Sequence, residues 1–294
     1  MLEVDHLVRR FGDVTAVDGV SFAVGDGQMT GFVGGNGAGK TTTMRMVMGV
    51  LTIHGGDVRW QGRPITAADR RRFGYMPEER GLYPKQPILD QLVYLGRLQG
   101  LPTRRARARA EELLDRFNLA DRHKDKLESL SLGNQQRVQI AAAVIGDPQM
   151  LVLDEPFSGL DPAAVDEMAD VLREFTGRGV PVLFSSHQLD LVDRLCDRLV
   201  VLSSGRVVAA GTADELRRRG GVRHRLVTSG DAGWVRDLPD INVIDVDGGT
   251  ALLDLADPRD TDRVLTEALR RGGVRELAEV VPTLAETYRE VTTK

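Results

Sequence analysis

Short apolar runs and amphipathic stretches alternate along the first two thirds of the chain. The apolar runs are β-prone and bounded by turn residues, which predicts strands at residues 20–24, 29–33, 150–153, 180–185 and 199–203. Apolar residues at helical spacing predict helices at residues 40–51, 162–175 and 188–195. Strands that alternate with helices in this way favour a parallel core sheet with helices on both faces, which is an α/β fold.

Two regions depart from this alternation. Residues 87–117 mix apolar and charged positions at helical period, with breaks at Gly100 and Pro102, and predict a helical subdomain over about residues 87–146. After the break at residues 217–221, the pattern becomes that of a small α+β unit. Its predicted elements are strands at residues 223–228, 242–246 and 276–281, a strand after the turn at 248–249, and helices at 233–238, 258–271 and 284–291. We therefore expect two domains, residues 1–221 and 222–294.

Composition limits the possible functions. The formal net charge of -4 gives no general affinity for nucleic acid, because binding to its phosphates needs an excess of Lys and Arg. No apolar run approaches the ~18 to 20 residues that span a bilayer, and the chain begins with polar sequence rather than a signal-peptide core. We expect a cytoplasmic protein that reaches a membrane only through a partner. The arginines of residues 103–112 fall around a predicted helix and favour a solvated surface over a lipid contact.

The sequence GGNGAGKTT, residues 34–42, follows a predicted strand and opens a predicted helix. It matches the phosphate-loop pattern GxxxxGK[ST] in the context that this pattern requires. Its glycines let successive backbone N–H groups curl around phosphates, and the positive end of the helix faces the same anion. We expect Lys40 to reach the β and γ phosphates, Thr41 to ligate Mg²⁺, and Thr42 to donate to the α phosphate. The complete match disfavours an ordinary glycine-rich turn.

The sequence MLVLDEP, residues 150–156, is an apolar strand that ends in two carboxylates. Ligands bind at the carboxyl edge of the sheet in open α/β folds, and the phosphate loop lies at the same edge. Asp154 is then the natural partner of Mg²⁺, and Glu155 is free to polarise the attacking water as general base. A solvated acidic turn would be the better interpretation if this motif stood alone.

Several motifs follow one another in a fixed order: GGNGAGKTT, a helical section, LSLGNQQR at residues 130–137, LVLDEP, SGLD and SSH. Over residues 2–215 this order resembles the nucleotide-binding subunit of an ATP-binding cassette (ABC) transporter. The resemblance implies a P-loop NTPase core with an antiparallel β subdomain and a helical subdomain, followed by a ferredoxin-like C-terminal accessory domain. It also implies ATP hydrolysis, with ATP and Mg²⁺ bound.

The resemblance further implies partners. Two chains, either identical or a pair of ABC ATPases, would form a head-to-tail dimer in which each ATP lies between one chain's phosphate loop and the other chain's LSLGN stretch. A separate transmembrane permease subunit would hold the ATPase at the inner face of the cell membrane. No nucleic acid would be involved.

Site residues follow from the same resemblance. The ATP-binding residues would be Phe11, stacked on the adenine ring, together with Gly34, Gly35, Asn36, Gly37, Ala38, Gly39, Lys40, Thr41 and Thr42. The signature residues that contact the partner's ATP would be Ser131, Leu132, Gly133, Asn134 and Gln135, with a helix opening near Asn134. Asp161 would lie at the dimer seam. Lys40, Glu155 and His187 would be catalytic, His187 holding the γ phosphate and water in line. Ser186 with the residues after it also fits a plain helix N-cap.

Two departures from the family pattern are informative. Glu78 in FGYMPEER occupies the place of the usual glutamine; it can ligate Mg²⁺ beside Thr41 and Asp154, but it cannot donate a hydrogen bond when ionised. Leu132 and Asn134 replace the commoner glycine and glutamine of the signature. Together with PEERGLYPK and the small C-terminal unit, they make the chain similar to the branch that serves drug, sodium or related export.

Other classes of function remain as alternatives. An importer ATPase is one, and a soluble ABC-type ATPase of repair or translation is another. A repair ATPase carries a long coiled coil between its motifs, for which the gap here is too short, and a translation ATPase carries two cassettes. A phosphate-loop kinase would lack LSLGN and SGLD. Lys40, Glu155 and His187 together disfavour a cassette that binds ATP without hydrolysing it.

Overall fold

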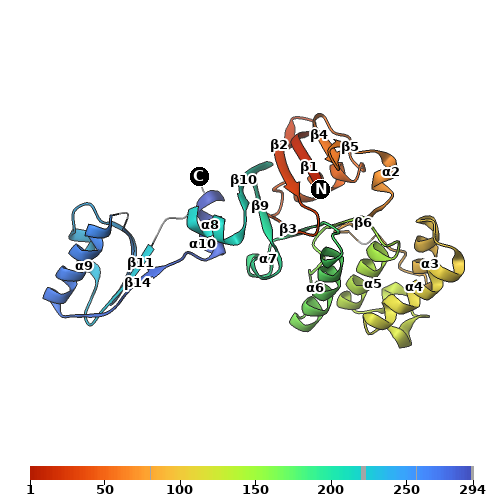
Figure 1. Cartoon of the computed structure of the whole chain (residues 1–294). Helices are drawn as coiled ribbons and strands as arrows, with labels where there is room; N and C mark the ends of the chain where they lie inside the picture. Colours follow the sequence, from red (N-terminus) through yellow and green to blue (C-terminus); the bar gives the residue numbers. More distant parts are fainter. Residues whose placement is uncertain (80, 220–222, 256, 293–294) are drawn as a thin grey trace. The chain divides into compact units, whose positions relative to one another are not determined.

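The computed structural model describes residues 1–79, 81–219, 223–255 and 257–292. They belong to two compact units, Met1–Gly211 and Thr212–Lys294. Figure 1 labels the elements of both units. The domain boundary that the sequence predicts, between residues 221 and 222, lies outside the described residues.

A six-stranded sheet forms the centre of the first unit, in the order β10-β9-β3-β8-β7-β6. Its strands are β3 (Met29–Val33), β6 (Phe73–Met76), β7 (Met150–Leu153), β8 (Val182–Ser186), β9 (Arg198–Ser203) and β10 (Arg206–Gly211). The neighbours from β9 to β6 pair in parallel, which confirms the predicted parallel core. The edge strand β10 runs antiparallel to β9 and makes the sheet mixed, because the short turn at Ser204 and Gly205, both with positive φ, returns the chain on itself.

A second, antiparallel sheet has the order β2-β1-β4-β5. Its strands are β1 (Leu2–Phe11), β2 (Val14–Val24), β4 (Gly55–Trp60) and β5 (Arg63–Pro64). The strand predicted at residues 20–24 is therefore present as the end of the longer β2, which belongs to this antiparallel sheet. Val20, Phe22 and Val24 alternate with more exposed positions, as in a sheet with one buried face.

Helix α1 (Lys40–Val47) contributes to the hydrophobic core that joins the two sheets. Met44 and Met46 of α1 share that core with Phe32 of β3 and Trp60 of β4. The sequence predicts that this helix continues to residue 51, but α1 ends at Val47. Gly49 adopts a left-handed conformation, with φ of 73°, that terminates the helix. Burial of α1 fixes the start of the helix, and with it the phosphate loop, against the core sheet.

The other face of the core sheet is covered by helices α5 (Leu132–Val144), α6 (Pro162–Gly177) and α7 (Leu189–Leu195), below the sheet in Figure 1. One face thus carries these helices and the other carries α1 and the antiparallel sheet, rather than helices alone on both faces.

The helical subdomain contains the long helices α3 (Ile88–Leu98) and α4 (Thr103–Arg116), which are separated at Gly100 and Pro102 as predicted. Shorter elements are α2 (Ala67–Arg70), η1 (Ala120–Arg122) and η2 (Leu127–Ser129).

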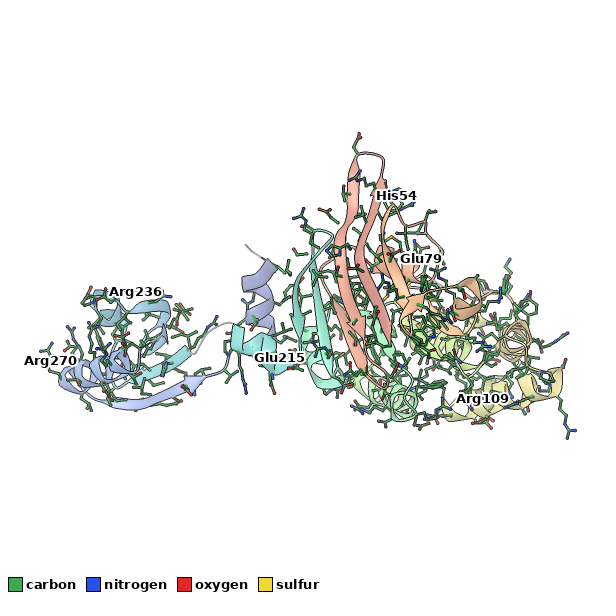
Figure 2. All side chains as sticks on the ribbon, turned by 45° about the horizontal axis from the view of Figure 1, so that its top comes forward. His54, Glu79, Arg109, Glu215, Arg236 and Arg270 are labelled. Carbon is green, nitrogen blue, oxygen red and sulfur yellow. The ribbon has the colours of Figure 1, made fainter. Side chains whose placement is uncertain are left out.

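The arginines of α4 lie at the surface of the first unit, as Figure 2 shows for Arg109. Arg107 pairs with Glu111 at 3.5 Å and Arg109 with Glu112 at 2.6 Å, both on the same helix. Such exposed pairs contribute little to stability and are typical of a solvated helix face.

The second unit contains an antiparallel sheet in the order β12-β13-β11-β14. Its elements are α8 (Ala213–Arg219), β11 (Arg223–Thr228), η3 (Gly233–Asp237), β12 (Asn242–Asp247), β13 (Thr250–Asp254), α9 (Pro258–Arg271), β14 (Val274–Val280) and α10 (Leu284–Thr292). The strand order is that of a ferredoxin-like fold. Leu226, Leu253 and Val264 belong to its buried core. The prediction of a helix at residues 233–238 is wrong, because the segment forms only the 3-10 turn η3. Pro239 has no backbone N–H and cannot continue the turn as an α-helix.

Among the described residues, no helix has the length and apolar character that a membrane span requires.

Candidate active site

The phosphate loop connects β3 to α1 and curls back over the start of the helix. Gly37 and Gly39 adopt φ of 78° and 101°, which other residues rarely do. A Cβ atom on Gly39 would also lie 2.8 Å from the carbonyl oxygen of Ala16. Nζ of Lys40 donates to the carbonyl oxygens of Gly34 at 2.6 Å and Gly35 at 3.3 Å. The ammonium group therefore lies inside the curve of the loop, where phosphate oxygens would approach it.

A cavity of about 410 Å³ opens over this loop. Its volume lies in the range of small-molecule sites. The cavity is lined by Phe11, Ala16, Gly35, Asn36, Gly37, Ala38, Gly39, Lys40, Thr41, Thr42, Glu78 and Glu155. The cavity thus brings together every predicted ATP-binding residue except Gly34. The carbonyl oxygen of Gly34 instead accepts the hydrogen bond from Nζ of Lys40. Ala16 is an addition that no sequence motif indicated.

Phe11 lies at the end of β1 with 46% of its surface exposed. The guanidinium carbon of Arg9 lies 4.6 Å from the centre of the Phe11 ring, a cation–π contact. Nη1 of Arg9 donates to the carbonyl oxygen of Thr52 at 2.8 Å and lies 3.1 Å from Nε2 of His54. Arg9 therefore supports the ring, which faces the cavity over the phosphate loop. Only its position two residues before Phe11 on the same strand could have indicated this contact.

Asp154 follows β7 directly and is completely buried. Its Oδ1 accepts a hydrogen bond from Oγ of Ser185 at 2.6 Å, whereas its Oδ2 is buried without a partner among the described residues. Burial raises the pKa of the Asp154 carboxyl above its ordinary value; the hydrogen bond from Ser185 opposes the rise, and the charge of Glu78 adds to it. The buried oxygen without a partner suits a carboxylate that binds a cation.

The oxygen atoms around Asp154 suit Mg²⁺. Oγ1 of Thr41 donates to Oε2 of Glu78 at 3.1 Å, and the charge of Glu78 acts on Asp154. Carboxylate and hydroxyl oxygens are the ligands of this hard cation, which keeps further positions for water and phosphate. Among the described residues, no group of three or more His, Cys, Asp or Glu could hold a metal ion. The oxygen atoms of Thr41, Glu78 and Asp154 are nevertheless of the kind that Mg²⁺ prefers.

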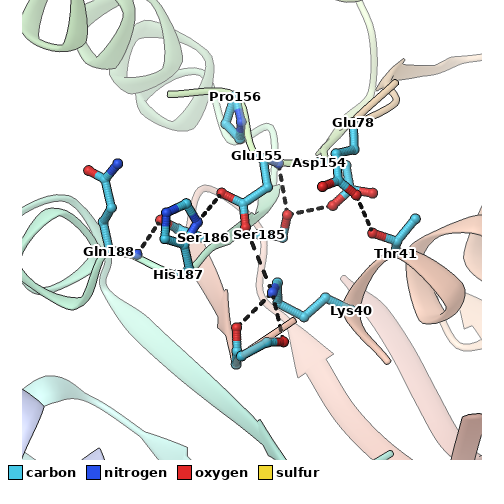
Figure 3. Close-up of polar contacts among 12 residues, drawn as sticks. Lys40, Thr41, Glu78, Asp154, Glu155, Pro156, Ser185, Ser186, His187 and Gln188 are labelled. Atoms are coloured by element: carbon cyan, nitrogen blue, oxygen red, sulfur yellow. Dashed lines mark hydrogen bonds and ion pairs between the residues drawn. The ribbon is translucent and has the colours of Figure 1, made fainter. Parts of the chain in front are cut away.

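Glu155 lies at the centre of a group of polar side chains from separate loops, drawn in Figure 3. Its Oε1 lies 3.7 Å from Nζ of Lys40, and its Oε2 lies 3.0 Å from Nδ1 of His187. The carboxylate is only 12% exposed, whereas the imidazole is 53% exposed. The structure thus brings the three residues that the sequence predicts to be catalytic together, with Glu155 in contact with both Lys40 and His187.

Two residues of this group were missed by the sequence analysis. Ser185 accepts a hydrogen bond from the backbone N–H of Glu155 at 2.8 Å while it donates to Asp154. Gln136 donates from Nε2 to the carbonyl oxygens of Glu155 and Pro156, both at 2.9 Å. A polar residue within the apolar strand VLFSS could have pointed to Ser185, because a buried hydroxyl needs a partner. Nothing in the sequence indicated the contact of Gln136.

The signature residues do not line the cavity of their own chain. Ser131 caps the N-terminus of α5, where its Oγ accepts from the N–H of Asn134 at 3.4 Å. The sequence analysis placed the start of this helix near Asn134, whereas the helix begins at Leu132. Leu132 is half exposed, and Nε2 of Gln135 donates to the carbonyl oxygen of Leu130 at 2.8 Å. The N-terminus of α5 thus begins with exposed residues at the surface of the first unit.

Asp161 caps α6, and its Oδ1 accepts from the N–H of Ala164 at 2.9 Å. This contact gives the residue a local structural function and does not test its place at a dimer seam. His187 follows β8, and Ser186 accepts the N–H of Gln188 at 3.0 Å. The N-cap of α7 is Gln188, whose side chain makes no capping hydrogen bond, so the interpretation of SSHQ as a plain helix N-cap at Ser186 is wrong. The contact of Ser186 is a local turn, and it coexists with the contact between His187 and Glu155.

Comparisons with known proteins agree with this geometry. Residues 17–158 match the family described as ABC transporter, and residues 211–292 match the C-terminal domain described as ATP-binding protein DrrA1-3-like. The ABC transporter ATP-binding protein YhaQ of Bacillus subtilis, itself described as uncharacterized, is 45% identical over 79% of this chain and 78% of its own length. The chain belongs to the ABC transporter ATP-binding proteins.

Relatives with a similar C-terminal extension place the chain more closely within that family. The daunorubicin resistance ATP-binding protein DrrA3 of Streptomyces coeruleorubidus is 36% identical over 99% of this chain and 95% of its own length. A solved ATP-binding subunit of an ABC transporter is 33% identical, with a TM-score of 0.69 over 75% of this chain and 93% of that one. This ABC protein is accordingly the ATP-binding, ATP-hydrolysing subunit of a transporter in the export branch of the family.

Proposed function

We propose that two copies of this ABC protein bind two MgATP molecules at a shared, head-to-tail interface and use their hydrolysis to drive a separate transmembrane permease. One observation carries the proposal: the phosphate loop and Glu155 line one cavity, whereas the signature residues lie outside it. The N-terminus of α5, capped by Ser131, carries partial positive charge and unpaired N–H groups that suit a phosphate. A second copy of the chain would bring its bound ATP to this helix N-terminus and would offer its own signature residues to the first copy's ATP.

The roles of individual residues in this proposal follow from the distances. Lys40 lies inside the phosphate loop and supplies positive charge to the β and γ phosphates. Glu155 accepts a proton from the attacking water as general base, and His187, 3.0 Å away, holds the base and the water in line with the γ phosphate. Phe11 presents its ring to the adenine.

Thr41, Asp154 and Glu78 would hold Mg²⁺. The bound cation would neutralise the charge of the phosphate oxygens. The buried, unpartnered oxygen of Asp154 and the two side chains beside it support this assignment.

The permease contact is assigned to the loop after Glu78, up to residue 86, and to the neighbouring face of α3. Tyr83, Tyr94 and Leu98 are large, exposed apolar residues there, and a cavity of about 470 Å³ lies beside Tyr94 and Leu98. Exposed apolar residues that gather in this way mark a protein contact. The ATPase would then sit at the inner face of the cell membrane without entering it. The net charge of -4 gives no support for a nucleic-acid partner.

Export is the proposed direction of transport. The relatives that support it are those named for daunorubicin resistance and linearmycin resistance and for Nod factor export. An importer ATPase finds no comparable support in the relatives reported above.

Complementation between two inactive variants tests the shared site. Ser131→Arg removes the signature half of the interface, and Lys40→Ala removes the phosphate-loop half. Each variant alone should show almost no ATPase activity, and a mixture should recover about one working site per mixed dimer. A mixture that stays inactive at every ratio of the two variants would contradict a site built from two chains.

A further inference from the structure

The backbone at Glu155 is unusual. Its φ of 50° places it in the left-handed region, which a residue with a side chain rarely occupies. Such a conformation persists only when the surrounding structure constrains it, and it often occurs at functional sites. The carboxylate that faces Lys40 and His187 therefore owes its direction to whatever holds this peptide.

Two hydrogen-bonding side chains hold the backbone on either side of Glu155. Its N–H donates to Oγ of Ser185 at 2.8 Å. Its carbonyl oxygen and that of Pro156 both accept from Nε2 of Gln136 at 2.9 Å. Gln136 is only 8% exposed, so water does not readily replace its amide. A bifurcated contact to two successive carbonyl groups defines the orientation of the turn more closely than a single bond would.

Gln136 belongs to the signature helix α5 and not to the nucleotide cavity, whose lining excludes it. The first turn of α5 also contacts the loop that follows Glu155. A Cβ atom on Gly159 would lie 2.8 Å from Cδ2 of Leu132, and one on Gly133 would lie 3.4 Å from Cδ2 of Leu160. The helix that offers its N-terminus to the partner's nucleotide thus contacts the Glu155 loop at two places within one chain.

We propose that Gln136 is a positioning residue for ATP hydrolysis: its amide fixes the Glu155 peptide so that the carboxylate faces the nucleotide of the same chain. The proposal rests on the role of Glu155 as general base. Because Gln136 is part of α5, the direction of this base depends on the position of the signature helix. Gln136 acts on hydrolysis and not on nucleotide binding, since it contacts neither the phosphate loop nor Phe11.

Substitutions of two buried glutamines on α5 provide the first test. Gln136→Met keeps the length of the side chain and removes the amide, and Gln136→Glu keeps its shape but cannot donate when ionised. Gln139→Met is the matched control, because Gln139 lies on the same helix, is 6% exposed and makes no described hydrogen bond to the Glu155 loop. Both Gln136 variants should lose about ten- to a hundredfold in kcat, with the dissociation constant of MgATP within about twofold of wild type.

The result that overturns the proposal is a kcat for both Gln136 variants equal to that of Gln139→Met. Thermal unfolding of each variant accompanies the kinetics. If Gln136→Met does not fold, Gln136→Glu decides, because it retains the volume and the packing of the glutamine.

Mixed dimers provide a sharper test. A chain with Ser131→Arg and a chain with Lys40→Ala leave one working site, formed by the Glu155 of the first and the signature of the second. Gln136→Met added to the first chain should abolish most of this activity, whereas the same change in the second should leave more than half of it. Equal losses in both placements, or a loss only in the second, would show that Gln136 acts through the signature contact and would overturn the proposal.

The two proposals fail in different ways. An inactive mixture of Ser131→Arg and Lys40→Ala chains would contradict the proposal of a shared site. The kcat of Gln136→Met compared with that of Gln139→Met, each in otherwise unchanged chains, would then test the positioning role by itself. Wild-type kcat in Glu155→Gln would remove the general base, and with it the basis of this inference.

Discussion

Nδ1 of His187 lies 3.0 Å from Oε2 of Glu155, although the two residues belong to different loops and are separated by helix α6 and strand β8. The other oxygen of the same carboxylate lies 3.7 Å from Nζ of Lys40. A carboxylate held between two basic groups is already directed to the place where a phosphate would enter. The geometry places the proposed general base, Glu155, between Lys40 and His187.

Glu155→Gln should separate ATP binding from ATP hydrolysis. The amide retains the volume of the carboxylate but cannot accept the proton of the attacking water. We expect the ATPase rate to fall by about 10²- to 10⁴-fold, the range that general-base catalysis supplies, with ATP affinity retained. Size-exclusion chromatography with ATP should show a stable dimer. An ATPase rate close to wild type in this variant would refute the assignment of the base.

Phe11→Ala should weaken the binding of ATP and leave the binding of tripolyphosphate unchanged. In the proposed site the ring would contact the base and not the phosphates, and stacking on an aromatic side chain contributes about 1–3 kcal/mol. Calorimetric titration with each ligand measures both effects. Val14→Ala, at the other end of the same turn and also exposed, is the control. Equal weakening of both ligands would show that the ring acts on the phosphate loop instead.

Glu78→Gln should raise the Mg²⁺ concentration that half-saturates the ATPase. The change removes one negative charge beside Asp154 and Thr41, and a loss of about 1.4 kcal/mol corresponds to a tenfold shift. Glu79→Gln is the matched control, because Glu79 is the exposed neighbour and does not line the cavity (Figure 2). An unchanged Mg²⁺ requirement in Glu78→Gln would exclude Glu78 from the metal site.

Asp154→Asn should stabilise the nucleotide-free protein while it abolishes the ATPase. Burial raises the pKa of the Asp154 carboxyl, so the folded state favours its protonated form. Stability from this preference is present at acid pH and is lost as the pH rises through the raised pKa, because ionisation of the buried group then opposes folding. The neutral amide avoids that loss.

The measurement for this variant is the melting temperature as a function of pH, without nucleotide or Mg²⁺. Asp154→Asn should melt at a higher temperature than wild type at pH 7, and the difference should shrink toward acid pH. A variant that melts below wild type at pH 7 would contradict the view that ionisation of the buried Asp154 carboxyl opposes folding.

The motifs of this chain were readable because their chemistry is local. GGNGAGKTT needs glycines at fixed spacing, since the backbone itself binds the phosphates, and Lys40 and Thr41 follow in the same turn. β7 and the carboxylates after it are likewise contiguous. The helix pair α3 and α4 was predicted for the same reason, because Gly100 and Pro102 interrupt a helical period within the sequence itself.

Elements whose identity depends on distant neighbours were harder to predict. The strand predicted at residues 20–24 is present, but it is only the end of the longer strand β2, which starts at Val14 and pairs with β1 in the antiparallel sheet. Residues 233–238 have helical spacing, but Pro239 and the packing of Val235 against the C-terminal core leave only a 3-10 turn. Apolar periodicity alone does not tell which sheet a strand joins or whether a short segment completes a helical turn.

The sequence by itself determined the family, the phosphate loop and the identity of the groups proposed to carry out the chemistry, because each depends on residue types at fixed local spacing. Only the tertiary structure decided how these groups are held. The contacts of Gln136 and Ser185 with the Glu155 peptide join residues whose separation along the chain carries no pattern. Such contacts arise when separate elements pack together, and a hydrogen bond between them leaves no periodic trace in the sequence.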